Sequence, residues 1–254
     1  MSSKAPLLLL HGVTMSSAAW DEVVPLLADD FDVIVPTLPG HRGGPKMPDA
    51  SFEDLVDFVE EILDGRGFET VHLAGNSLGG WIALELARRG RARSVCGLSP
   101  AGFWPEGRPD ATGVVTALRR TRRLAQLTSF LAPVVVATGP ARKKAMELVA
   151  EHGDRMSSQQ ALGALRDMVG CEAASSLFRG TGYCAPMDPL PCPVTLAWSG
   201  KDRIFPPARY GPVAQERLPG ARYIELAGLG HVPMIDDPAA TAAVIRESTL
   251  IPQG

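Results

Sequence analysis

The sequence lacks the features that mark exported, membrane-spanning and metal-binding proteins. Its four cysteines show neither a Cys-x-x-Cys pair nor a zinc-ligand spacing. We therefore expect reduced, partly buried thiols, with a disulfide among the last three as the alternative. No apolar run approaches the roughly 20 residues that cross a bilayer, and the run near Met1 is too short for a secretory signal. These absences predict a cytoplasmic protein with no membrane span and no metal.

A large excess of charge is also absent. Lys and Arg total 25 against 28 Asp and Glu, which gives a formal net charge of −3 and a pI of about 6.0. Nucleic-acid-binding domains are usually strongly basic, so no nucleic-acid partner is expected. The composition is typical of a globular protein, and 254 residues can bury a substantial core. None of these features determines the oligomeric state.

Buried strands alternate with amphipathic helices over the first hundred residues. The expected strands fall in APLLLLHG, FDVIVP, TVHLAG and RSVCGLSP, and helical patterns lie between them. Short apolar runs bounded by turn residues are typical of strands buried in a parallel sheet. The alternation resumes with PVTLAWSG and ARYIELAG and ends in a helix. The sequence therefore predicts an α/β fold with a mostly parallel central sheet flanked by helices.

The alternation stops between residues 103 and 187. This segment shows helical patterns without buried strands, so we expect a helical lid inserted between core segments 1–102 and 188–254. Charge divides near the same boundary, because residues 103–185 hold 11 Lys or Arg and 7 Asp or Glu. The four arginines between 119 and 123 predict a solvated helix face, and attraction of an anionic substrate is the alternative.

A serine lies between two glycines where a predicted strand meets a predicted helix. In GNSLG, Gly75 and Gly79 flank Ser77. In this setting G-x-S-x-G forms a nucleophile elbow, whose sharp turn leaves no room for side chains at the two glycines. The serine then lies at a helix N-terminus, where N–H groups favour a developing oxyanion. The alternative is a glycine-rich turn that merely contains a serine.

A serine nucleophile needs a base and a carboxylate that orients the base. His231 follows the last predicted strand, and Asp202 follows the strand before it, which gives the order Ser, Asp, His. The oxyanion hole is expected from the backbone N–H groups of Leu78, next to the serine, and Val13, after the first strand. A loop histidine and a turn-forming aspartate are the alternatives.

Four stretches in this order resemble the α/β-hydrolase superfamily, specifically its lidded serine hydrolases of the esterase and lipase type. They are HGVTMSSAAW, GNSLGG, WSGKDRIFP and GLGHVPMIDDP. The resemblance implies acyl transfer through an acyl-enzyme on a small-molecule substrate, with no cofactor. Family members often carry an aspartate, a G-H-G and a serine after the second strand, where this chain has Thr37, Arg42 and Gly44. This departure affects the expected edge of the pocket.

Hydrolysis of a carboxylic ester of a small to medium apolar substrate is the first expectation. The expected pocket residues are Phe103, Trp104 and Val232, and apolar side chains of the inserted segment, such as Phe130 and Leu131, are further candidates. One alternative is carbon–carbon hydrolysis of a vinylogous diketone, although the glycine-proline-rich oxyanion loop and the tryptophan after the histidine are missing. Perhydrolase or haloperoxidase activity without cofactor is another, and a ligand-binding receptor is the non-enzymatic one. Relatives that open epoxides or remove halogen use an aspartate nucleophile, and Ser77 argues against both reactions.

Overall fold

The computed structural model describes residues 4–105, 113–180 and 182–251. Its centre is a six-stranded sheet in the order β2-β1-β3-β4-β5-β6. All neighbouring strands are parallel, which confirms the predicted α/β architecture. The strands are β1 (Ala5–Leu10), β2 (Phe31–Ile34), β3 (Val71–Asn76), β4 (Ala92–Leu98), β5 (Val194–Ser199) and β6 (Arg222–Leu226).

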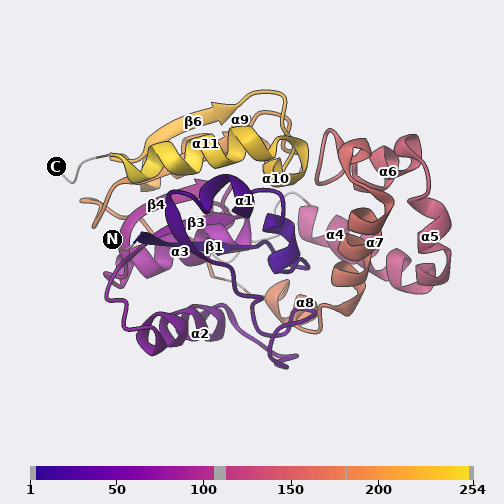
Figure 1. Cartoon of the computed structure of the whole chain (residues 1–254), viewed down its shortest axis with the longest axis horizontal. Helices are drawn as coiled ribbons and strands as arrows, with labels where there is room; N and C mark the ends of the chain where they lie inside the picture. Colours follow the sequence, from indigo (N-terminus) through magenta and orange to yellow (C-terminus); the bar gives the residue numbers. More distant parts are fainter. Residues whose placement is uncertain (1–3, 106–112, 181, 252–254) are drawn as a thin grey trace.

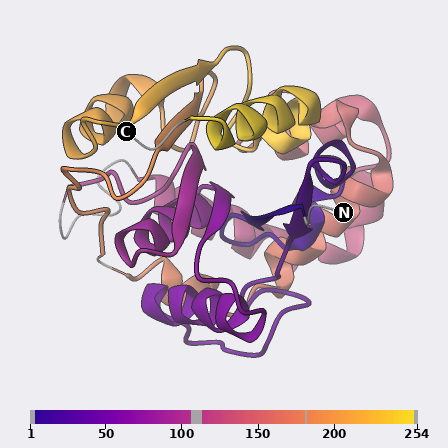
Figure 2. The same ribbon diagram turned by 60° about the vertical axis from the view of Figure 1, so that its left-hand side comes forward.

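Helices cover both faces of the sheet because the strands bury side chains on both faces. In β1, Leu8 and Leu10 pack among residues of α2 (Phe52–Gly65) and α3 (Leu78–Arg88). Leu7 and Leu9 point the other way, toward residues of α1 (Val24–Leu27) and α11 (Pro238–Thr249). Figures 1 and 2 show α2 and α11 on opposite sides of the sheet. The remaining core helices are η1 (Ser17–Trp20), α9 (Pro207–Arg217) and α10 (Pro233–Asp236).

Between β4 and β5 the described residues form helices and no strand. Figure 1 shows α4–α7 as a lobe at one end of the long axis of the molecule. We call this part, residues 114–170, the helical lobe. Its helices, with α8 after them, are α4 (Val114–Leu127), η2 (Ser129–Leu131), α5 (Ala132–Val135), α6 (Gly139–Met146), η3 (Gly153–Arg155), α7 (Ser158–Gly170) and α8 (Ala174–Leu177).

All four cysteines are free and buried, as expected for reduced thiols. Burial raises the pKa of the Cys96 thiol to about 12, so this thiol stays protonated at neutral pH. Within the described part of the chain, no helix is both long and apolar enough to span a membrane.

Candidate active site

The turn that carries Ser77 joins the end of β3 to the start of α3 and has a strained backbone. Ser77 has φ 55° and ψ −115°, a backbone conformation that residues other than glycine rarely adopt. A Cβ at Gly75 would overlap the carbonyl oxygen of Gly79, and one at Gly79 would overlap the carbonyl oxygen of Leu10. The turn therefore needs glycine at both positions, and it holds the serine side chain above the sheet edge.

Asp202 and His231 meet at the same edge of the sheet, in the loops after β5 and β6. His231 Nδ1 lies 2.7 Å from Asp202 Oδ2, and both side chains are almost fully buried. The second carboxylate oxygen of Asp202 accepts the backbone N–H groups of Ile204 and Phe205 at 2.8 and 2.7 Å. Burial alone would raise the pKa of Asp202, but the His231 ring and these N–H groups together lower it. Asp202 is thus held ionised as an acceptor for His231 Nδ1–H.

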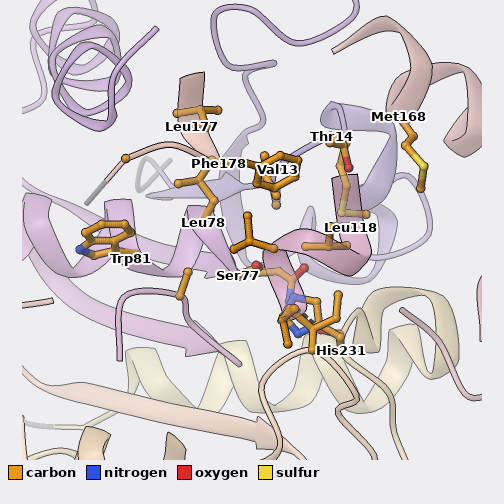
Figure 3. A pocket seen from close by; sticks show the side chains of 18 of the residues that line it. Val13, Thr14, Ser77, Leu78, Trp81, Leu118, Met168, Leu177, Phe178 and His231 are labelled. Atoms are coloured by element: carbon orange, nitrogen blue, oxygen red, sulfur yellow. Dashed lines mark hydrogen bonds between the residues drawn. The ribbon is translucent and has the colours of Figure 1, made fainter. Parts of the chain in front are cut away.

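Ser77 and His231 both line one cavity, as Figure 3 shows. The hydrogen bonds between described residues do not include one from Ser77 Oγ to the His231 ring. Such contacts are often long in unliganded enzymes and tighten when substrate binds. The structure therefore brings the three predicted residues to one place, with the Asp202–His231 contact formed.

The backbone N–H groups of Val13 and Leu78 have no acceptor among the described residues. Leu78 is the first residue of α3, where N–H groups have no partner within the helix. Val13 lies in a tight turn that is closed by Met15 N–H donating to Gly12 O at 3.2 Å. Both residues line the cavity. Two backbone donors near Ser77 are thus free to bind an oxyanion.

Two side chains that sequence reasoning left without a role hold the His231 loop in place. Asn76, directly before the serine, donates through Nδ2 to the carbonyl oxygen of His231 at 2.8 Å. Asp236 is fully buried and accepts the N–H groups of Gly230, Glu151 and His152 at 2.6 to 3.0 Å. The neighbouring Asp237 caps α11 by accepting the Ala240 N–H at 2.9 Å. Asp236 instead joins the His231 loop to the helical lobe.

His11, which directly follows β1, joins two loops through its ring nitrogens. Its Nε2 accepts the Leu38 N–H at 3.0 Å, so Nδ1 carries the proton and donates to Gly12 O at 2.9 Å. Burial, with His41 as the second cause, lowers the pKa of His11 to about 3. A neutral His11 therefore fastens the loop after β2 to the loop that contains Val13.

The unusual residues of the loop after β2 contact the oxyanion loop and the helical lobe. Thr37 Oγ1 accepts the Ser17 N–H at 3.1 Å. Asp167 on α7 is buried, accepts the Ser16 hydroxyl at 2.6 Å and pairs with Arg42 at 2.6 Å. Ser16 in turn caps η1. Of the positions where this chain departs from the family pattern, Arg42 thus attaches the lobe to the core, and Thr37 joins two loops of the core.

The cavity above Ser77 has a volume of about 600 Å³ and a mostly apolar wall. Trp104 and Val232 line it, as predicted, while Phe103 does not. The Phe103 ring is buried against Trp198, with centroids 6.0 Å apart, so core packing accounts for this residue. The wall also includes Trp81, Val114, Leu118, Met146, Met168, Leu177, Phe178, Ile204 and Phe205.

Other expectations for the inserted segment are confirmed only in part. Phe130 and Leu131, which the sequence suggested for the pocket, are exposed. Arg119, Arg120 and Arg123 are exposed, as expected for a solvated helix face, whereas Arg122 is half-buried. Arg119 bonds to Phe178 O, and Arg122 bonds to the carbonyls of Met168, Val169 and Cys171. Only part of the arginine run therefore faces solvent.

Within the described ranges, no group of three or more His, Cys, Asp or Glu side chains could hold a metal ion. The polar groups at the site lie in the segments that follow β1, β3, β5 and β6. Their arrangement, with a serine on a strained turn, a carboxylate–imidazole pair and two free N–H donors, is suited to nucleophilic attack on a carbonyl carbon.

Comparison with known proteins finds relatives that are named as hydrolases. A relative from Mycobacterium tuberculosis, named epoxide hydrolase EphH, is 33% identical over 195 residues, which cover 75% of this chain and 91% of that protein. A pimeloyl-[acyl-carrier protein] methyl ester esterase from Aromatoleum aromaticum is 29% identical, with 96% and 98% covered. The structure of an enol-lactonase from Burkholderia xenovorans superposes with a TM-score of 0.73 at 19% identity, covering 97% and 91% of the two chains.

The model of the family described as "Alpha/beta hydrolase family" matches residues 7–244, nearly the whole chain. The protein is accordingly a member of the alpha/beta hydrolase family and an enzyme of the serine-hydrolase type.

Proposed function

We propose that the enzyme hydrolyses a carboxylic ester of a small to medium apolar substrate through an acyl-enzyme on Ser77. The observation that carries the proposal is that His231, which is paired with the buried Asp202, lines one apolar cavity together with Ser77. A serine hydroxyl is a weak nucleophile at neutral pH and needs such a base. Relatives named as ester hydrolases, such as the esterase from Aromatoleum aromaticum, support the same reaction.

In the first half of the reaction, Ser77 Oγ attacks the ester carbonyl carbon while His231 Nε2 takes its proton. The carbonyl oxygen becomes an oxyanion, which the N–H groups of Val13 and Leu78 bind. The alcohol leaves with the proton from His231, and the acyl group stays on Ser77. Water then attacks the acyl-enzyme with His231 again as base, and the acid and free serine are released. Asp202 holds the imidazole tautomer and stabilises the imidazolium in both halves.

The cavity supports an apolar substrate. A volume of about 600 Å³ suits a compact ligand, and the aromatic and aliphatic wall offers few polar groups that would orient a charged one. We further propose that residues 103–187 act as a lid, because Val114, Leu118 and Met168 of the helical lobe form part of the wall. Location in the cytoplasm remains a prediction.

The name of the relative from Mycobacterium tuberculosis raises epoxide opening as a second candidate. An aspartate nucleophile opens an epoxide to an ester, which water can hydrolyse. Attack by Ser77 Oγ would instead form an ether, which neither His231 nor water can cleave under these conditions. The residue at position 77 therefore favours carbonyl substrates, and a stable covalent adduct is the expected result with an epoxide.

A fluorophosphonate probe tests the proposal, because it reacts with activated serines. The wild type should be labelled on Ser77, and Ser77→Ala should lose both the label and the turnover of p-nitrophenyl esters. Ser99→Ala is the matched control, since Ser99 is also buried after a strand with positive φ, at 43°. Labelling of Ser77→Ala at the wild-type level would overturn the proposal.

A substrate comparison separates ester hydrolysis from the carbon–carbon alternative. The wild type should turn over p-nitrophenyl esters of short and medium acyl chains and leave a vinylogous 1,5-diketone largely intact. Rapid cleavage of the diketone with negligible ester turnover would reverse this assignment while leaving the role of Ser77 in place. A graded series of acyl chain lengths would then measure how far the cavity extends.

A further inference from the structure

Exposed apolar side chains gather at one end of the helical lobe. Among the described residues nine large hydrophobic side chains are exposed, and six of them lie between positions 124 and 135. We call residues 124–135 the lobe tip. The six are exposed by 42 to 76% and comprise Leu124, Leu127, Phe130, Leu131, Val134 and Val135. Apolar side chains scattered singly over a surface are ordinary, but a cluster of this kind marks an interaction site.

The same part of the chain is strongly basic. Residues 113–146 contain seven Lys or Arg and no Asp or Glu, in a protein whose net charge is −3. Arg120 and Arg123 of α4 are exposed and make no hydrogen bond or ion pair with a described residue. They lie within one helical turn of Leu124 and Leu127, so cationic and apolar groups share one side of α4. This combination fits a partner that is negatively charged and apolar at once.

The position of the lobe tip limits what can cover it. In Figure 1, α5 lies at the far end of the long axis, away from the sheet, with α6 beside it. A second copy docked symmetrically would bring two basic lobes together, and like charges oppose that contact. A projecting end with apolar side chains and free guanidinium groups instead suits a lipid surface. There the acyl chains can surround the apolar side chains, and the phosphates can pair with the guanidinium groups.

We propose that the lobe tip docks on membrane surfaces that contain anionic phospholipid. The apolar side chains enter the boundary between headgroups and acyl chains, and Arg120 and Arg123 pair with lipid phosphates. The opposite side of α4 faces the cavity, because Val114 and Leu118 line it. Docking would therefore place the cavity close to the membrane. The proposal concerns binding alone and does not depend on the reaction at Ser77.

Vesicle co-sedimentation tests the proposal with the full chain. Vesicles of phosphatidylcholine mixed with phosphatidylglycerol should bind the wild type, and vesicles of phosphatidylcholine alone should bind it at least about tenfold more weakly. The double variant Arg120→Gln, Arg123→Gln should lose roughly 30-fold in affinity, since each basic residue near an anionic surface contributes on the order of fivefold. Added salt should also weaken wild-type binding, because it screens the attraction between the arginines and the lipid phosphates.

The apolar contribution is tested by Leu127→Ser with Phe130→Ser. This double variant should also lose at least about tenfold in affinity for the anionic vesicles. Leu26→Ser with Leu250→Ser is the matched control, because both leucines are exposed, by 42% and 73%, and lie outside the lobe. All the changed side chains are exposed, so each variant should fold. Circular dichroism and the Tm check this.

Three results would overturn the proposal. The first is no binding of the wild type to anionic vesicles. The second is equal loss of binding in the control and in the lobe-tip variant. The third is self-association by analytical ultracentrifugation that the lobe-tip variant abolishes, which would assign this surface to a second copy of the chain.

Discussion

Helices α3 and α4 carry apolar residues at helical spacing, but the protein uses them in different ways. Nine of the eleven residues of α3 are buried against the sheet and α2, whereas none of the fourteen residues of α4 is buried. One side of α4 faces the cavity, and the other, with Leu124 and Leu127, faces solvent. Periodicity therefore predicts a helix, but it does not say what covers the apolar side.

The largest expected effect lies in the core. Asp202→Asn should lower kcat for a p-nitrophenyl ester by about 10⁴-fold. The amide oxygen can keep the bonds from Ile204 and Phe205, but the amide N–H groups would donate to His231 Nδ1 and move the ring proton to Nε2. A base protonated on that nitrogen cannot accept the proton of Ser77. Steady-state kinetics, with the Tm as a check on folding, measure the effect.

Asp167→Asn is the matched control for this prediction, because Asp167 is as buried as Asp202 but belongs to the lobe. Its kcat should stay within about tenfold of the wild type, since the loss is confined to a contact outside the triad. A similar fall in kcat for both variants would contradict the division between a core that holds the chemistry and a lobe that shapes the cavity.

The same substitution in the two regions should give very different losses of stability. Leu9→Ala, in a fully buried position of β1, should lower the free energy of unfolding by about 2–5 kcal/mol. Leu127→Ala, at a side chain that is 69% exposed, should change it by less than about 0.5 kcal/mol. Urea unfolding measures both. Comparable losses would mean that the lobe tip is covered in the free protein.

The core should also make the protein sensitive to acid through His11. His11 stays neutral down to about pH 3 in the folded protein, because its pKa is lowered to about 3. In the unfolded chain, where its pKa is the usual 6.5, His11 binds a proton once the pH falls below that value. The stabilisation is complete above pH 6.5 and is lost as the pH falls, by about 1.4 kcal/mol per pH unit.

Unfolding free energies at two pH values measure this term. Between about pH 7.5 and pH 5 the wild type should lose about 2 kcal/mol more than His11→Gln, whose amide can replace the ring bonds without titrating. The difference between the two slopes is the readout, so a constant loss of stability in the variant does not matter. Parallel slopes would show that His11 is already exposed to protons in the folded state.

A loss of stability of similar size is expected where the lobe is attached to the core. Asp167→Asn should lower the free energy of unfolding by about 1–3 kcal/mol, because the amide weakens the contacts with Ser16 and Arg42. Arg42 is half exposed, which keeps the loss moderate. Calorimetry should show a fall in Tm of about 2–4 °C per kcal/mol. Ser16→Ala, which leaves the ion pair intact, should show a smaller fall.

The sequence was sufficient for the sheet and for the order of the site residues. A buried strand needs an apolar run such as residues 7–10, and the sharp turn at Ser77 needs glycine on both sides. Both requirements act on neighbouring residues, so a sequence pattern can reveal them. The contacts of Asp236 and Asp167 could not be predicted, because all of their side-chain partners except Gly230 lie 84 to 151 positions away in sequence. For the same reason Phe103 and Phe130 were assigned to the pocket, although one packs in the core and the other faces solvent.

The account depends most on Ser77 as the residue that carries the acyl group. Turnover of a p-nitrophenyl ester, stopped by acid within the first cycles, should leave the acyl mass on the peptide that contains Ser77, as measured by mass spectrometry. An initial burst of about one nitrophenol per enzyme should accompany it if deacylation is slow. Acyl mass on another residue, or continued turnover by Ser77→Ala, would contradict the account.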